Sequence, residues 1–168
     1  INLDNIKTTS LKTMKYMFYG CLSLNEINLS SINTSNVNNM EFIFVRCSSL
    51  KTLNLSNFDT SNVEVMVDMF HECASLTSLN LTSIDLTNFN TSNVINMEYM
   101  FLRFTSLVII DLSNFDASKV TDMRGMFAHC YSVKSIILPF FHSSELLNIN
   151  CLFEKCYSSN YLDLSNFN

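Results

Sequence analysis

Hydrophobic residues recur along the chain with a fixed spacing. A short apolar–polar–apolar pattern, such as Leu53-Asn54-Leu55, ends in an anchor residue, and successive anchors lie 26 residues apart. The anchors are Leu3, Leu29, Leu55, Leu81, Leu86, Leu112, Leu138 and Leu164, and only the step from Leu81 to Leu86 breaks the period. A period of this size is typical of repeat proteins, in which each unit buries its apolar face against its neighbours.

The repeat predicts a single array over residues 1–168, with six complete units of 26 residues, the start of a seventh unit at Leu164 and a five-residue insertion at 82–86. Because Leu79-Asn80-Leu81 already completes the pattern, we expect the inserted residues to bulge from the array without shifting the next unit. In the alternative, Ile84-Asp85-Leu86 forms the strand. Neither end shows a polar capping unit, so we interpret the chain as a fragment of a longer protein.

Two periodicities alternate within each unit. The apolar–polar alternation around each anchor predicts a short strand, and strands that recur once per unit should pair in parallel. After the turn sequence SNFDTSN, the apolar residues Val63, Met66 and Phe70 follow at steps of three and four, which is the spacing of one helix face. The sequence therefore predicts an α/β fold with a parallel β-sheet on one face and short helical or 3₁₀ turns on the other.

Equivalent positions of successive units carry the same kind of side chain, which predicts continuous ladders in the core. Phenylalanine occupies the position fifteen residues after the anchor, at Phe18, Phe44, Phe70, Phe101, Phe127 and Phe153. Cysteine occupies the position eighteen residues after it, at Cys21, Cys47, Cys73, Cys130 and Cys156.

The cysteine column has a structural and a covalent interpretation. Phe104 takes this position in the unit that begins at Leu86. Phenylalanine can replace a buried thiol but not a disulfide partner or a metal ligand, so we interpret the column as part of the core. Disulfides between neighbouring units are the alternative. Cys151 lies outside the column, and we do not assign it to the core.

Residues with catalytic or metal-binding potential do not form a recognisable motif. His71 and His129 lie near cysteines but without the paired spacing of a structural zinc site, so we expect surface histidines and no metal. Asp59 and Asp116 share a position with Asn90, which favours a turn role over acid–base chemistry. Nucleophile, phosphate-loop and zinc-protease motifs are absent from the sequence. We therefore expect a protein that is not an enzyme and has no cofactor.

Net charge and hydropathy narrow the choice of partners. The formal net charge is -5 and the isoelectric point is about 5.0, whereas a nucleic-acid-binding surface needs a basic stripe. No apolar run approaches the length of a membrane span. We expect no nucleic-acid partner and no direct membrane insertion of this segment.

The repeat consensus LxxLNLSNFDTSNVxxMxxMFxxCxSL resembles the BspA-like leucine-rich-repeat surface protein family, known also from mycoplasma surface lipoproteins. The resemblance covers essentially the whole chain. It is most literal from Leu50 to Cys73 and from Leu107 to Cys130, and the last complete unit departs from it. The resemblance implies a leucine-rich-repeat-like right-handed solenoid and an extracellular or cell-surface location. It supplies no catalytic residues.

The strand face is the candidate binding surface. The residue before each anchor should point away from the core, because its neighbours point inward. This column contains Asn28, Asn54, Asn80 and Asp111. Two interpretations remain open for it and are compatible: an amide ladder that bonds from unit to unit, and a polar surface that binds a partner.

The strand face changes character toward the C-terminus. Ile109, Ile137 and Tyr161 replace short polar residues there, with Pro139 and Phe140 beside them. Exposed apolar clusters with a polar rim mark contact sites, and tyrosine is favoured at binding hot spots. We therefore expect an apolar contact patch. In the alternative, a segment that follows this chain covers it.

These observations favour a non-enzymatic surface recognition or adhesion module that binds a protein or glycan partner. The alternative is an architectural repeat element packed against neighbouring subunits of a large extracellular or surface assembly.

Overall fold

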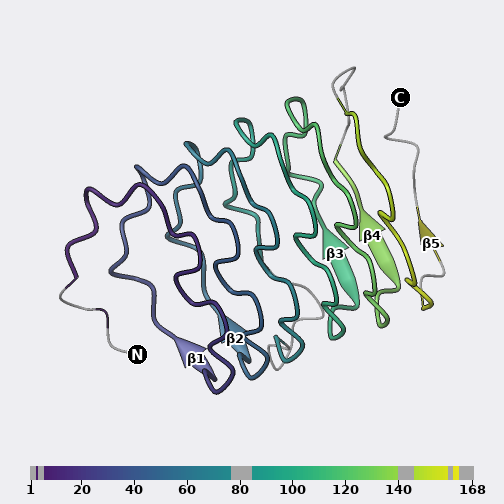
Figure 1. The fold of residues 1–168 in the computed structure, drawn as a ribbon, viewed down its shortest axis with the longest axis horizontal. Coiled ribbons are helices and arrows are strands. Elements are labelled where there is room, and N and C mark those ends of the chain that lie inside the picture. The colour runs from purple at the N-terminus through teal and green to yellow at the C-terminus, as the bar shows by residue number, and fades with distance from the viewer. Residues whose placement is uncertain (1–2, 4–5, 77–84, 140–145, 159–160, 163–168) are drawn as a thin grey trace.

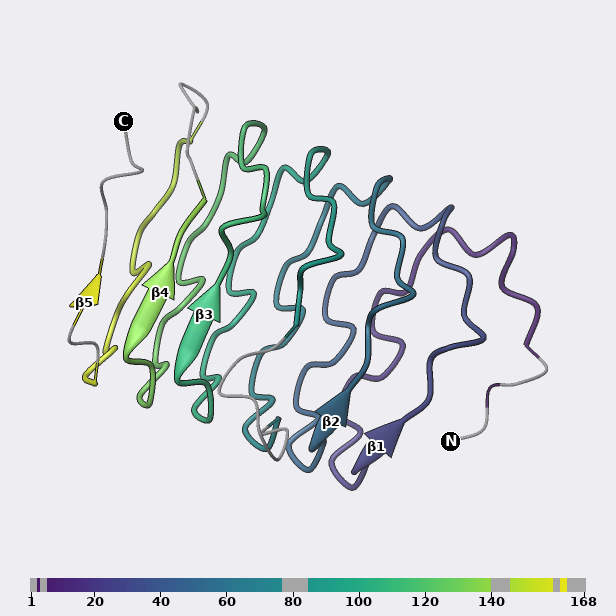
Figure 2. The ribbon, with the colours of Figure 1, turned by 180° about the vertical axis from the view of Figure 1, so that it is seen from behind.

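The chain winds through a series of similar coils that lie side by side from the N-terminus to the C-terminus (Figure 1). The computed structural model describes residue 3 and residues 6–76, 85–139, 146–158 and 161–162. One side of the stack carries strands β1 to β5 and is called the strand side. The other, called the turn side, is formed by residues 13–21, 39–47, 65–73, 96–104, 122–130 and 148–156. Figure 2 shows the stack from behind.

The strand side consists of parallel pairs, as the alternating pattern predicts. Strand β1 (Glu26–Ile27) pairs with β2 (Thr52–Leu53), and β4 (Ser135–Ile137) pairs with both β3 (Ile109–Asp111) and β5 (Tyr161–Leu162). All pairs follow the 26-residue register, in which Ile110 lies opposite Ile136 and Ile136 lies opposite Leu162. The prediction of parallel strands is therefore confirmed, and in the described part of the chain they form two small sheets, of two and three strands.

The prediction of short helical or 3₁₀ turns is wrong, because the described residues contain no helix. The turn side bonds to the next coil instead. In each of the five successive pairs of coils, four backbone N–H groups donate to carbonyl oxygens of the following coil at 2.7–3.2 Å, for example from Phe44 to Met69. Helical bonds would need the same N–H groups, which are already engaged between coils. Nothing in the described part of the chain is a helix that could cross a membrane.

Two residues of each coil have positive φ, four positions apart, and they fold the turn side into tight turns. They are Tyr16 and Gly20, Phe42 and Arg46, Asp68 and Glu72, Tyr99 and Arg103, Gly125 and His129, and Cys151 and Lys155. In the first coil, Tyr16 (φ 60°) precedes Met17, whose N–H donates to the Met14 carbonyl at 3.0 Å. Positive φ at the third residue is characteristic of a type II turn.

This turn geometry explains why the sequence imitates a helix. Met66, Met69, Phe70 and Cys73 are fully buried, and their spacing is that of one helix face. Here the spacing arises because the chain reverses at Asp68 and again at Glu72. Sequence periodicity alone does not separate the two backbones.

The core lies between the strand side and the turn side. The phenylalanine rings of successive coils stack with centroids 5.5–5.9 Å apart and planes within 14° of parallel, from Phe18 through Phe153. Phe44, Phe70, Phe101 and Phe127 are fully buried, Phe18 is nearly so, and Phe153 is half-buried.

The insertion is described only at its end, since residues 77–84 lie outside the described ranges. Leu86 is 2% exposed, like the anchors Leu55 and Leu112. Asp85 Oδ1 accepts the Thr87 N–H at 3.0 Å, as Asn54 Oδ1 accepts the Ser56 N–H. Asp85 and Leu86 thus occupy the regular positions of the repeat. The expected bulge and the alternative strand both include residues that the structure does not describe.

Candidate functional site

The strand side presents the polar column that the sequence singles out. Asn28, Asn54 and Asp111 are exposed, and Asn80 lies outside the described residues. The Oδ1 atoms of the three exposed residues accept hydrogen bonds of 2.9–3.0 Å from the backbone N–H two residues further on. Each of these Oδ1 atoms therefore bonds within its own turn, and among the described residues no side-chain bond joins Asn28 to Asn54. The turn needs only one side-chain acceptor, and Asn and Asp both supply it, which explains why Asp111 can replace asparagine in this column.

Amide ladders between coils do exist, but at two other columns. Asn57 Nδ2 donates to the Leu29 carbonyl at 3.0 Å, and Asn114 Nδ2 donates to the Leu86 carbonyl at 3.1 Å. In the second column, the Nδ2 atoms of Asn62 and Asn93 donate to carbonyls of the preceding coil at 2.7–2.8 Å. Sequence reasoning missed these ladders, although the asparagines repeat two and seven residues after the anchors.

Two isoleucines are exposed on neighbouring strands. Ile109 of β3 is 37% exposed and Ile137 of β4 is 43% exposed, whereas Ile110 and Ile136 between them are buried. Ile109 lies opposite Ser135 and Ile137 lies opposite Asp111, so the two isoleucines are diagonal neighbours. The structure thus brings two members of the expected apolar patch onto one surface with polar residues beside them.

The other members of the expected patch are placed less clearly. Tyr161 lies in β5 opposite Ser135, so the backbone puts it on the far side of Ser135 from Ile109. Its side chain and Phe140 are outside the described part of the structure. Pro139 is buried, so its expected place on the exposed surface is wrong.

A cavity of about 340 Å³ opens on the strand side between the coils that flank the insertion. Its lining consists of Leu53, Asn54, Leu55, Ser56 and Asp85. Asp85 Oδ1 accepts the Thr87 hydroxyl at 2.7 Å in addition to the Thr87 N–H. These bonds, led by the hydroxyl, lower the pKa of Asp85, so a carboxylate faces the cavity at neutral pH. The cavity can therefore accept hydrogen bonds from a polar ligand.

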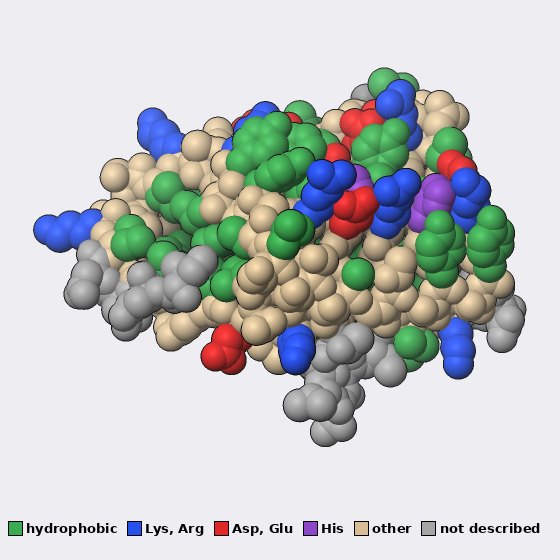
Figure 3. All heavy atoms as spheres, turned by 60° about the horizontal axis from the view of Figure 1, so that its bottom comes forward, with side chains coloured by type: hydrophobic (Ala, Val, Ile, Leu, Met, Phe, Trp, Pro, Cys, Tyr) green, Lys and Arg blue, Asp and Glu red, His purple; other side chains and the backbone are tan. Residues whose placement is uncertain are grey.

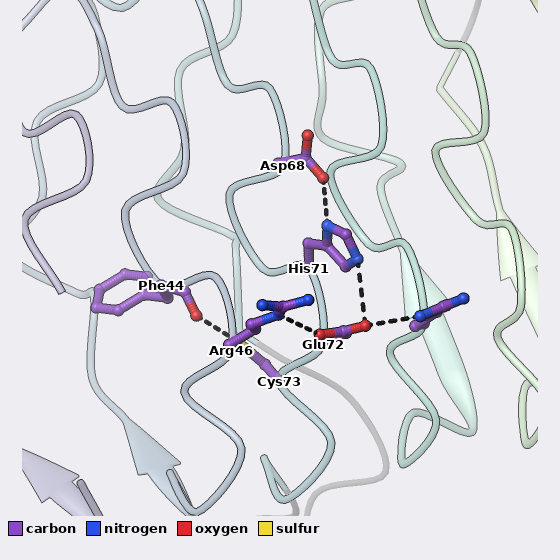
Figure 4. A network of polar contacts seen from close by, with 7 residues as sticks. Phe44, Arg46, Asp68, His71, Glu72 and Cys73 are labelled. Carbon is purple, nitrogen blue, oxygen red and sulfur yellow. Dashed lines mark hydrogen bonds and ion pairs between the residues drawn. The ribbon is translucent and has the colours of Figure 1, made fainter. Parts of the chain in front are cut away.

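The turn side carries a row of alternating charges. Arg46 Nε donates to Glu72 at 2.9 Å (Figure 4). Arg103 donates to the other oxygen of Glu72 at 2.8 Å. Asp68 Oδ1 contacts His71 Nδ1 at 2.6 Å beside them. Figure 3 shows basic, acidic and histidine side chains adjoining one another on this face. The sequence signal for the row was charge reversal at one column, from Arg46 to Glu72 to Arg103.

The opposite charges in this row largely neutralise one another. The hydrogen bond from Arg103, assisted by the bond from Arg46, lowers the pKa of Glu72. Both arginine side chains are more than half exposed, whereas Glu72 is one-quarter exposed. Exposed ion pairs of this kind contribute about 0.2–1 kcal/mol each. The row thus joins three coils weakly and leaves little net charge for a ligand.

The cysteine column lies against the phenylalanine ladder. Cys47, Cys73 and Cys130 are fully buried, and Cys21 and Cys156 are half-buried. The thiols of Cys47, Cys73, Cys130 and Cys156 donate to phenylalanine carbonyls of the preceding coil at 3.0–3.1 Å, as from Cys73 to Phe44 (Figure 4). Burial raises the pKa of Cys47 and of Cys130 to about 12. A buried thiol of this kind is a poor nucleophile.

The remaining candidates for chemistry are dispersed. All six cysteines are free thiols, Phe104 is fully buried in the cysteine column, and Cys151 is exposed outside it. His129 contacts the Tyr131 hydroxyl at 2.7 Å. Asp59 Oδ1 accepts the Ser61 N–H at 3.0 Å, and Asp116 does the same for Ser118 at 2.9 Å. Within the described ranges, no three His, Cys, Asp or Glu side chains are placed to hold a metal ion.

Comparison with known proteins identifies the family of this chain. No curated protein matches the sequence. A crystal structure of a leucine-rich repeat protein from T. pallidum is similar at a TM-score of 0.37 and 18% identity, over 86% of this chain and 69% of that one. A similarity of that size carries no argument about fold or function. The sequence model of a family matches twice, at residues 1–83 and 75–168. Because these matches span the whole sequence, the chain belongs to the family described as Mycoplasma protein of unknown function, DUF285.

Proposed function

We propose that this repeat protein is a non-enzymatic recognition or adhesion module that binds a protein or glycan partner through its strand side. The observation that carries the proposal is the exposure of Ile109 and Ile137 at diagonal positions of β3 and β4. The positions in β1 and β2 that correspond to Ile109 are occupied by the polar residues Glu26 and Thr52. The strand side therefore has a polar part and a part with apolar contacts.

The repeat allows this surface to vary without cost to the core. Inward residues such as Ile110 and Ile136 are almost completely buried, while the alternate residues do not contribute to the core. Asp111 and Ser135 adjoin the two isoleucines and provide hydrogen-bonding groups at the rim. An apolar centre with a polar rim is the usual composition of a recognition surface.

Location and architecture are part of the same proposal. The resemblance of the repeat to BspA-like surface proteins supports an extracellular or cell-surface protein and a right-handed leucine-rich-repeat-like solenoid. The polar side chains that sequence analysis weighed for catalysis, such as Asp59 and Asp116, bond to backbone N–H groups of their own turns, which supports a role without catalysis.

The test is a comparison of matched surface variants. The purified chain is screened on a glycan array and on a panel of extracellular matrix proteins, and each hit is measured by surface plasmon resonance. Ile109→Ser combined with Ile137→Ser should weaken binding about tenfold or more, since each exposed isoleucine contributes around 1 kcal/mol. Ile95→Ser is the control, because Ile95 is also 43% exposed but lies outside the strand side. Equal binding by the double variant and the control would refute the strand-side surface.

Stacked tyrosines that directly follow the turn-side segments favour a second candidate, an architectural element packed on several sides. Tyr131 and Tyr157 stack with centroids 5.9 Å apart while remaining 40% and 75% exposed. If they form a packing contact, Tyr131→Ser combined with Tyr157→Ser will reduce self-association in sedimentation experiments. Unchanged sedimentation across the concentration range would leave recognition by the strand side as the better function.

A further inference from the structure

The cavity beside Asp85 lies where the repeat is irregular. Asn54 and Asp85 hold equivalent positions, yet they are 31 residues apart instead of 26 because the insertion falls between them. Both begin the same turn, with Oδ1 bound to an N–H two residues on. Functional sites often depart from the regular pattern of the surrounding fold.

The asparagine side chains two residues after the anchors make fewer bonds between coils at this step than at its neighbours. Asn57 Nδ2 donates to three carbonyl oxygens of the preceding coil, at 3.0–3.4 Å. Asn114 Nδ2 donates to two, at 3.1 and 3.2 Å. Asn88, which bridges the coils at the cavity, donates only to the Ser56 carbonyl, at 3.3 Å. The space of about 340 Å³ thus opens where the amide ladder is weakest.

The lining of the cavity combines polar groups with apolar surface. Asp85 has one oxygen bound to Thr87, and no cation pairs with it among the described residues. Asn54 uses Oδ1 within its turn, its amide nitrogen bonds to none of the described residues, and Ser56 adds a hydroxyl. Half-buried Leu53 contributes apolar lining. A carboxylate acceptor and an amide donor that line the same cavity suit a ligand with adjacent hydroxyl groups and an apolar ring face.

We propose that this cavity binds one hexopyranose residue of a glycan, with Asp85 accepting from its hydroxyls and Asn54 donating to them. The proposal rests on the recognition function proposed above and names the ligand class for a second site on the same side. Because the groups are few and the cavity is open, the affinity for a single sugar should be weak, with a dissociation constant on the order of 1 mM.

The experiment uses the whole chain and free sugars. Glucose, galactose, mannose and N-acetylglucosamine are titrated while ¹H–¹⁵N spectra are recorded. At least one sugar should shift the Asn54 side-chain amide together with the Ser56 and Thr87 backbone signals. Absence of shifts with all four sugars would overturn the site.

Variants separate the site from the fold. Asp85→Asn keeps the turn, because Asn54 makes the same turn elsewhere, and it should weaken sugar binding about tenfold by removing a charged acceptor. Asp116→Asn makes the same change in an equivalent turn of a coil that does not line the cavity and should leave binding within about twofold. Equal affinity of Asp85→Asn and the unaltered chain would overturn the proposal. The Ile109 and Ile137 double variant tests the strand-side function independently. It should lose partner binding whether or not the chain binds a sugar at Asp85, so failure of one proposal does not decide the other.

Discussion

The hydroxyl of Thr60 bonds twice to the backbone of Asn90 in the next coil. It accepts the Asn90 N–H at 2.8 Å and donates to the Asn90 carbonyl at 3.0 Å. Thr34 and Thr91 make the same pair of bonds to Asp59 and Asp116. Each threonine is almost fully buried, so one hydroxyl satisfies two backbone groups at the edge of the core.

Thr60→Val keeps the shape of the side chain but removes both bonds. The N–H and carbonyl of Asn90 then lose their partner, which should lower the free energy of unfolding by about 1–3 kcal/mol. Urea unfolding measures the loss, and hydrogen exchange at Asn90 should accelerate. Thr60→Ser keeps the hydroxyl and is the control. A valine variant as stable as the serine variant would show that the hydroxyl does not hold the coils together.

Gly125→Ala tests a close contact on the turn side. Gly125 has φ +55°, and an added Cβ would lie 2.4 Å from Cε1 of Tyr99. Gly20→Ala is the matched control, because Gly20 has φ +69° and nothing within 4 Å of the added Cβ. Both variants should lose about 1–2 kcal/mol from backbone strain, and Gly125→Ala should lose more in thermal unfolding. Adding Tyr99→Ala to Gly125→Ala should remove that excess; if it does not, the contact is not its cause.

The thiols should differ sharply in their reactivity. Cys47, Cys73 and Cys130 are fully buried with raised pKa values, so native protein should protect them from iodoacetamide at pH 8. Exposed Cys151 is the internal control and should be labelled first. Peptide mapping after timed alkylation gives the order. Labelling of Cys73 as fast as Cys151 in folded protein would contradict its place in the core.

Glu72→Gln should make stability less dependent on acid pH. The pKa of Glu72 is lowered below its usual 4.5, so its ionised form contributes stability above that pH and loses it as pH falls. At neutral pH the variant should be less stable by about 1 kcal/mol, and the difference should shrink with acid and with salt. Glu64→Gln is the control, since Glu64 has no ion-pair partner among the described residues. A difference that persists undiminished at pH 3 would assign the effect to packing.

The fixed period made the parallel strands predictable. The 26-residue spacing that joins Leu53 to Ile27 in sequence also joins them in the sheet. The turn side was not predictable in the same way. Met66, Met69 and Phe70 are inward in a helix and in a pair of reversed turns alike, and only the positive φ of Asp68 and Glu72 distinguishes them. Neither residue is the glycine that would have signalled such a conformation.

The candidate surfaces were also predictable only in part. The period places Ile109 and Ile137 on neighbouring strands, and alternation predicts their exposure. The hydrogen bonds of Asn54 and Asn57 could not be assigned from sequence, because either asparagine can bond within its turn or to a neighbouring coil. The cavity at Asp85 depends on the distance between two coils, and one inserted segment does not fix that distance.

Deletion of Thr82 to Leu86 tests how the insertion fits the array. The deletion restores the 26-residue step and puts Asn80 and Leu81 in the positions of Asp85 and Leu86. Asparagine can replace Asp85 in its turn, and leucine replaces leucine at the anchor, so we expect a folded protein within about 1 kcal/mol of the original stability. Circular dichroism and urea unfolding measure this. Deletion of five regular residues, Ser56 to Thr60, is the control, because it removes buried Phe58 and Thr60 and shifts the register. Comparable loss of folding in both deletions would mean that Asp85 and Leu86 hold positions that Asn80 and Leu81 do not replace.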